Sequence, residues 1–114
     1  MSKSYICPVC GYDGLEKGPY NEHDYGSFVD CSCCGFEFGV SEDNDVDLGY
    51  TVIPKEMREA AFQLYRKQWI EEGAFVANTE EYPKEYQDNG QVKREIIIKQ
   101  LKRLNLPIEK FYFL

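Results

Sequence analysis

Two pairs of cysteines in the first third of the chain constrain its fold more than any other feature. They are Cys7 with Cys10 and Cys31 with Cys34, each spaced C-x-x-C and followed directly by glycine. Two residues between two cysteines allow a tight turn to aim both sulfurs at one point, and two such turns predict a tetrahedral four-sulfur site of about 2.3 Å radius, which suits zinc. Glycine after each pair favours a positive φ, where a Cβ would clash.

The size of the chain and its cysteine count favour metal ligation over disulfide bonds. In a chain of 114 residues, the first forty or so are too few to build an adequate core alone, so a metal ion would take over that role. No segment approaches the roughly 18 apolar residues of a membrane span, and residues 1–4 lead into no secretory signal. We therefore expect a cytoplasmic protein with reduced thiols, in which four of five cysteines are ligands.

Charge is distributed unevenly between the two halves of the chain. Residues 1–50 hold two lysines against ten acidic residues, whereas residues 51–114 are nearly balanced, and the total is −7. Four thiolates around Zn²⁺ would add about two further negative charges to the first half. Such a surface repels a phosphate backbone. The charge therefore disfavours a nucleic-acid partner for the cysteine-bearing half.

Short extended segments flank the second cysteine pair. Residues 27–30 lead into it, and residues 36–40 leave it with a period of two. Strand, turn and strand, repeated for both pairs, is the layout of a zinc ribbon. Phe28, Phe36 and Phe38 would supply its small apolar face.

Two helical segments follow the cysteine pairs. A proline suits the first turn of a helix predicted over residues 54–72, which Gly73 would end. Asp88 or Asn89 can cap a second helix, predicted over residues 91–104. Both segments carry an apolar face at helical spacing.

Helical periodicity divides the first of these segments into a buried and an exposed face. The expected buried face holds Met57, Ala61, Phe62, Leu64, Tyr65 and Trp69. Arg66 falls on the opposite, polar face. The core shared by the two helices is expected to comprise Phe62, Tyr65, Trp69, Ile97 and Leu101.

The fold class that these segments predict is α+β. Residues 1–41 would form the zinc ribbon, and residues 42–114 a helical region packed on it. The long connection over residues 74–89 is expected to contain a short helical turn at residues 83–87. The apolar tail, residues 111–114, either folds back onto the helices or is offered to a partner.

Two further residues near the cysteine pairs could act as metal ligands. Cys33 could replace Cys34, but the C-x-x-C spacing satisfies four-sulfur geometry without it. His23 is the only histidine, and with four thiolates in place it is expected to be a solvated loop residue. Four thiolates leave no open position for a catalytic water, and one histidine offers little for a catalytic dyad. We therefore expect no enzymatic activity.

Two other segments resemble binding sites by composition. Residues 43–49 imitate the start of a calcium loop, but Pro54 stands where a bidentate acid is needed, so we interpret them as a solvated connector. The second helix carries a basic set, Lys93, Arg94, Lys99, Lys102 and Arg103. This set could meet nucleic acid, although a polar helix face turned toward the acidic half of the chain is the preferred interpretation.

Two family resemblances bear on the metal. Residues 5–12 resemble the first cysteine turn of a rubredoxin, which implies iron at the same four positions and electron transfer as an alternative. Residues 7–15 and 31–39 more closely resemble the cysteine-rich, CPCC-type zinc-ribbon segment of small bacterial proteins of unassigned function. Residues 65–74 resemble the helix that follows in such proteins. That resemblance implies a structural zinc ribbon in a bacterial cytosol, with Ser32 standing where proline is often found.

The function expected from these observations is a non-enzymatic protein-binding module stapled by zinc. The acidic half of the chain suggests a basic protein partner, as for an immunity protein or antitoxin. A nucleic-acid-binding zinc ribbon and a rubredoxin-like iron carrier are the alternatives. The oligomeric state is left open.

Overall fold

The computed structural model describes residues 5–23, 25–41 and 55–106. It is a small α+β structure with two α-helices and a two-stranded antiparallel hairpin, as expected for the fold class. The elements in chain order are η1 (Lys55–Met57), α1 (Arg58–Glu71), η2 (Lys84–Tyr86), β1 (Gln87–Asp88), β2 (Gln91–Val92) and α2 (Arg94–Arg103). The expected division at residues 41 and 42, the segment 43–49 and the tail 111–114 lie at or outside the limits of the described residues.

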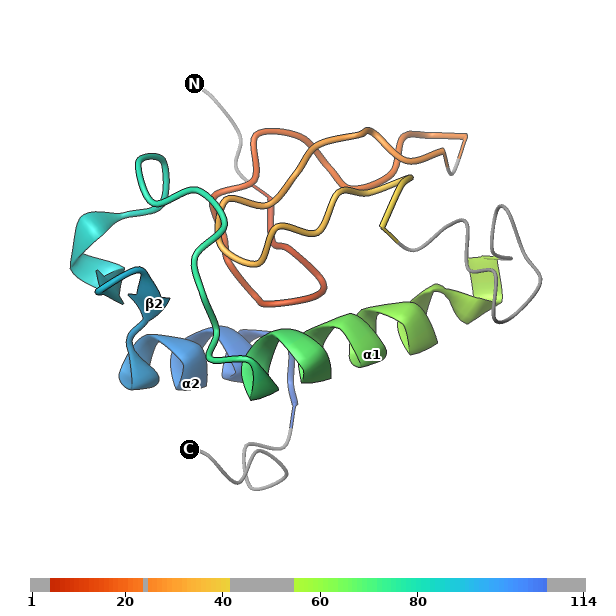
Figure 1. The fold of residues 1–114 in the computed structure, drawn as a ribbon. Helices are drawn as coiled ribbons and strands as arrows, with labels where there is room; N and C mark the ends of the chain where they lie inside the picture. Colours follow the sequence, from red (N-terminus) through yellow and green to blue (C-terminus); the bar gives the residue numbers. More distant parts are fainter. Residues whose placement is uncertain (1–4, 24, 42–54, 107–114) are drawn as a thin grey trace.

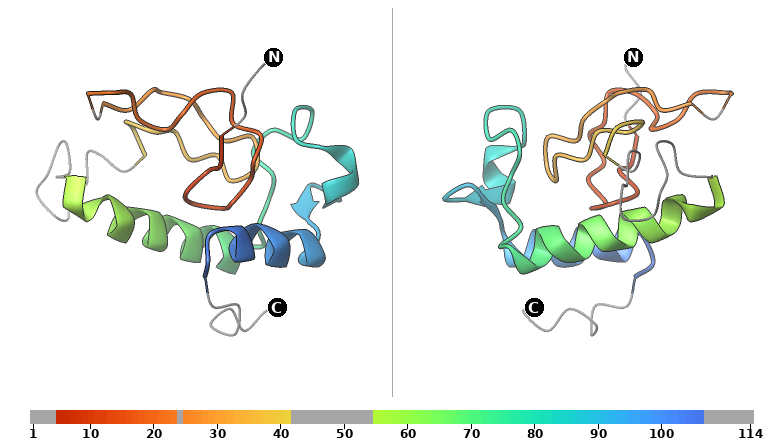
Figure 2. Two further views of the ribbon diagram at one scale, coloured as in Figure 1. Left: turned by 180° about the vertical axis from the view of Figure 1, so that it is seen from behind. Right: turned by 45° about the vertical axis from the view of Figure 1, so that its right-hand side comes forward.

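The cysteine-bearing segment forms a layer of irregular chain on one side of α1 and α2 (Figures 1 and 2). Its only paired positions among the described residues are isolated bridges, such as Asp30 with Glu37 beside the second cysteine pair. The predicted strands over residues 27–30 and 36–40 are therefore wrong as regular strands. Phe28 at φ 62° and Gly39 at φ 101° interrupt the extended backbone on either side of this bridge.

Helix α1 begins later than predicted and ends where expected. A short 3-10 turn, η1, precedes it, and Glu72 caps its C-terminal end ahead of Gly73 at φ 117°. Its orientation differs from the sequence prediction at two positions. Leu64 is 54% exposed, and Arg66, which was placed on the polar face, is only 4% exposed.

The connection after α1 is ordered by a hairpin that the sequence analysis missed. Strands β1 and β2 pair antiparallel with Gln87 opposite Val92. Asn89 and Gly90 turn the chain between them with φ of 54° and 79°, as in the type I′ turns that favour Asn-Gly. Asn89 is thus a turn residue rather than a helix cap.

Helix α2 starts after this hairpin, three residues later than predicted, and Lys93 is its N-cap. The short helical turn expected within residues 83–87 is confirmed as η2. None of the helices in the described part of the chain is long and apolar enough to cross a membrane.

The core joins the cysteine layer to the helices. Phe36 packs edge-on against Phe62 and Tyr65 of α1, with ring centroids 5.4 and 4.9 Å apart. The predicted core residues Phe62, Trp69, Ile97 and Leu101 are buried, and Tyr65 is partly buried against them. Phe28, which was expected on the same apolar face, is instead 65% exposed.

Candidate metal centre

The two cysteine pairs form turns of the same backbone pattern. In the first cysteine turn (residues 7–11), the Gly11 amide donates to the Cys7 carbonyl across 2.9 Å. In the second cysteine turn (residues 31–35), the Gly35 amide donates to the Cys31 carbonyl across 2.8 Å. Gly11 and Gly35 have φ of 82° and 81°. The positive φ predicted after each pair is therefore confirmed.

The four paired cysteines meet at one point. The Sγ atoms of Cys7 and Cys34 are 3.8 Å apart, and those of Cys10 and Cys31 are 3.6 Å apart. All four sulfurs lie within 4.8 Å of one another. A regular tetrahedron with metal–sulfur bonds of about 2.3 Å has edges of about 3.8 Å. The Cys7–Cys34 and Cys10–Cys31 distances match this edge, and no pair of sulfurs is more than 4.8 Å apart, so the cluster is close to the size of a four-thiolate metal site.

The sulfurs are buried, and burial and mutual hydrogen bonds shift the pKa values of Cys10, Cys31 and Cys34. None of the four cysteines is more than 4% exposed, and all are free thiols. Burial raises the pKa of Cys10 and of Cys34. Hydrogen bonds from the thiols of Cys10, Cys34 and Cys7 lower the pKa of Cys31. Four thiolates at this separation would repel one another unless a cation lay between them, so the cluster could hold a metal ion.

Cys33 and His23 take no part in this four-sulfur cluster. Cys33 is fully buried, and its sulfur lies 3.6 Å from Nε2 of Gln100. His23 is exposed and lies 3.6 Å from the carboxylate of Glu22. That neither residue is a ligand stays a prediction.

Side chains from both helices bind the carbonyls of the first cysteine turn. Arg66 of α1 donates through Nε to the Val9 carbonyl and through Nη2 to the Pro8 carbonyl. Gln100 of α2 donates to the Cys10 carbonyl across 2.9 Å. The next carbonyl, of Gly11, accepts from Arg103. Four consecutive carbonyls are thus bound by three side chains from distant parts of the sequence.

Different groups bind the second cysteine turn. The carbonyls of Ser32 and Cys33 accept from the backbone amides of Asn78 and Ala77, across 2.9 and 3.0 Å. The Cys34 carbonyl accepts from the Tyr65 hydroxyl across 3.0 Å. Burial raises the pKa of Tyr65 to about 12, so this hydroxyl stays protonated as a donor at neutral pH. Every one of these donors is uncharged.

Arg66 and Gln100 are site residues that the sequence analysis did not identify. Periodicity placed Arg66 with the solvated residues of its helix. Gln100 precedes the buried Leu101 and follows the buried Ile97 by three positions, so its place beside an apolar stripe was a signal for a buried amide. Tyr82 completes this contact by donating to Oε1 of Gln100 across 2.6 Å.

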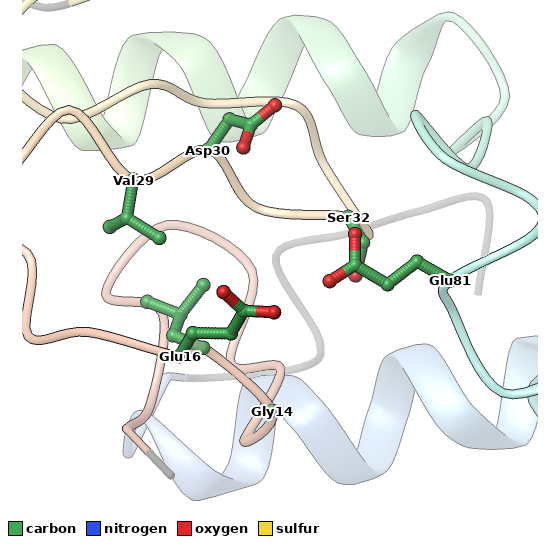
Figure 3. A pocket seen from close by; sticks show the side chains of 7 residues that line it. Gly14, Glu16, Val29, Asp30, Ser32 and Glu81 are labelled. Atoms are coloured by element: carbon green, nitrogen blue, oxygen red, sulfur yellow. The ribbon is translucent and has the colours of Figure 1, made fainter.

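An acidic cavity is lined mainly by residues of the cysteine-bearing segment (Figure 3). Its volume is about 140 Å³. The carboxylates of Glu16 and Glu81 point toward each other across it, and Asp30 lies on its rim. Ser32, from the second cysteine turn, also lines it. The described carboxylates therefore give this face a concave, negatively charged surface.

Fold and site together define a small α+β protein with a buried cluster of four cysteines that could hold a metal ion. The chain is 51% identical over 112 residues to "Uncharacterized protein YoaQ" of Bacillus subtilis (strain 168), covering 97% of this chain and 95% of YoaQ. It is 49% identical over 113 residues to "Uncharacterized protein YozI" of the same organism, covering 97% and 93%. The chain belongs to the family of these bacterial proteins. No protein-family model matches it, and no solved structure matches it.

These relatives bear out one part of the resemblance given above. Small bacterial proteins of unassigned function were expected, and YoaQ and YozI are such proteins by their printed names. Membership of the CPCC-type zinc ribbons stays a prediction.

Proposed function

We propose that the four cysteines hold one structural zinc ion, and that this zinc ribbon is the scaffold of a non-enzymatic, cytoplasmic protein-binding module. The observation that carries the proposal is the group of four buried sulfurs that lie within 4.8 Å of one another, with two pairs at 3.8 and 3.6 Å. Zinc is favoured by an all-thiolate set of this size. With four protein ligands, the coordination sphere has no position for a substrate or a catalytic water.

The burial of the cluster supports a structural role over electron transfer. Both cysteine turns are covered by side chains of α1 and α2 or by residues 77–78, and none of the four ligand candidates is appreciably exposed. An electron carrier needs its centre close to the surface that meets its partner. Iron in the same four positions remains the second candidate, because four cysteine thiolates also hold iron.

Exposed aromatic side chains support a protein partner. Tyr25 and Phe28 are 70% and 65% exposed. Phe28 is also held at φ 62°, a costly backbone region for a bulky residue, and its ring gains no burial in return. Aromatic residues are enriched at protein interfaces. The acidic residues of the same half of the chain would attract a basic partner.

The contacts of α2 argue against nucleic acid. Arg103, one of the five basic residues noted in this helix, binds the Gly11 carbonyl and lies 3.6 Å from the carboxylate of Asp13. The guanidinium is therefore turned toward the cysteine layer rather than toward a phosphate backbone. Arg94, Lys99 and Lys102 stay exposed, beside an acidic layer that repels phosphate.

Elemental analysis of the purified chain tests the metal. We expect one zinc per chain and a colourless protein. Stoichiometric iron with strong visible absorbance would favour the electron-carrier alternative, and a protein without metal would refute both.

Affinity capture from a bacterial lysate tests the partner. We expect wild-type protein to retain a basic protein that the double variant Tyr25→Ala/Phe28→Ala loses. Leu64→Ala is the matched control, because it removes another exposed apolar side chain, 54% exposed, from α1. Equal retention by all three proteins, or none by the wild type, would contradict the proposed binding surface.

A further inference from the structure

The burial of Arg66 is the least expected feature of the molecule. Its side chain leaves the middle of α1 and is 4% exposed. Both of its described hydrogen bonds go to uncharged carbonyls, of Pro8 and Val9. Among the residues that the structure describes, no carboxylate forms an ion pair with it. A buried charge is strongly unfavourable unless an opposite charge compensates for it.

The four-sulfur cluster supplies a charge of the required sign. Pro8 and Val9 are the two residues between the ligand candidates Cys7 and Cys10, so the guanidinium lies against the turn that carries two of the sulfurs. Four thiolates with one divalent cation carry a net charge of −2. Burial lowers the pKa of Arg66, and the charges of Glu59, Cys10 and Cys7 oppose that shift.

The other arginine at this turn does not fill the same role. Arg103 binds the Gly11 carbonyl, but it is only partly buried and lies 3.6 Å from Asp13, which offsets its charge. Gln100 and Tyr65, which bind the other carbonyls of the two turns, are neutral. Arg66 therefore provides the buried positive charge that the described part of the site otherwise lacks.

We propose that Arg66 is the counter-ion of the metal centre, and that its positive charge raises the affinity of the four sulfurs for a divalent cation. The inference rests on the proposed four-thiolate site. Arg66 acts as a positioning residue that also tunes the charge of the site, since it binds the carbonyls of the turn and leaves all four metal bonds to cysteine. This role also explains why a cationic side chain is buried although periodicity places it on the solvent face of its helix.

Two neutral variants and one charged variant separate charge from packing. Arg66→Gln removes the charge and keeps a donor, Arg66→Met keeps the length of the side chain, and Arg66→Lys keeps the charge. Tyr65→Phe is the matched control, because it deletes an uncharged contact to the second cysteine turn from the adjacent position of α1. The full chain is used throughout, and cobalt-substituted protein verifies that the four-sulfur ligand set is retained.

Zinc affinity, measured by competition with a chelator, is the first readout. We expect Arg66→Gln and Arg66→Met to bind zinc at least about tenfold more weakly, the scale on which a unit charge acts at an effective dielectric constant of about 20. Arg66→Lys should recover most of the loss, and Tyr65→Phe, which loses one uncharged contact, should weaken zinc binding clearly less than either neutral variant of Arg66. Equal affinity of the Gln, Lys and wild-type proteins would overturn the proposal.

The reduction potential of the iron-substituted protein is the second readout, and it remains informative if one neutral variant folds poorly. The reduced site is more negative by one charge, so a nearby cation favours it. Removal of the charge in Arg66→Gln or Arg66→Met should therefore lower the potential, whereas Arg66→Lys should not. An unchanged potential in a neutral variant would overturn the role of Arg66 alone. A wild-type chain that binds no metal would instead refute the four-thiolate site.

Discussion

The two cysteine turns have the same backbone and different surroundings. In each turn, the amide of the final glycine donates a hydrogen bond to the carbonyl of the first cysteine, and this glycine has a φ near 80°. The first cysteine turn is then bound by Arg66, Gln100 and Arg103, and the second by backbone amides and one phenol. The local motif thus fixes the shape of each turn, while residues far away in the sequence fix its charge and its position in the core.

The largest predicted loss of stability comes from removing one ligand cysteine, and it should be the same for both turns because one ion joins them. Cys10→Ser in the first and Cys34→Ser in the second each leave three thiolates. Either change should release the metal and cost several kcal/mol, out of about 10 kcal/mol or more for a structural zinc site. Thermal unfolding together with metal content measures this loss. A variant that keeps its zinc and a cooperative transition would show that its cysteine is not a ligand.

The next effect should separate the two turns. A Cβ on Gly11 would overlap the backbone oxygen of Gln100, so α2 would have to move. A Cβ on Gly35 would lie 3.0 Å from the side chain of Ala77. The left-handed backbone should destabilise both alanine variants by about 1–2 kcal/mol. Gly11→Ala should lower the free energy of unfolding by clearly more than that.

Urea unfolding of the zinc-loaded variants measures the difference. Equal decreases in the free energy of unfolding for Gly11→Ala and Gly35→Ala would mean that α2 does not pack against the first cysteine turn as described.

A smaller difference is expected between the hydrogen bonds that hold the turns. Gln100→Leu removes the donor to the Cys10 carbonyl and the acceptor of the Tyr82 hydroxyl in a buried site. This change should lower the free energy of unfolding by about 2 kcal/mol. Tyr65→Phe removes one partly buried bond to the second turn and should cost about 1 kcal/mol. The free energies of unfolding decide the order, and a reversed order would contradict the closer dependence of the first turn on helix side chains.

The smallest effect is expected at His23, which lies outside both turns. Its side chain is exposed, and its imidazole lies 3.6 Å from the carboxylate of Glu22. His23→Ala should leave the zinc content and the unfolding midpoint unchanged. A loss of zinc in this variant would assign the histidine to the coordination sphere.

Local patterns explain which features the sequence could predict. The four ligand candidates and the conformation of Gly11 and Gly35 follow from short motifs, and the structure brings those residues together as expected. Asn89-Gly90 was also a local signal for a hairpin turn, but it was interpreted as the start of a helix.

Tertiary contacts explain what could not be predicted. Arg66 belongs to the polar face of α1 by periodicity, and only the carbonyls of a turn more than fifty residues away account for its burial. Phe28 was expected on the apolar face of the ribbon, but it lies at a φ of 62° and is 65% exposed. Periodicity and alternation contain no information on contacts with distant parts of the chain, so they cannot predict the burial of such positions.

X-ray absorption spectroscopy at the zinc edge of the purified full chain tests the central claim most directly. We predict one zinc per chain with four sulfur neighbours at about 2.3 Å. Nitrogen or oxygen in the first coordination sphere, or cysteines joined as cystines in a metal-free chain, would contradict it.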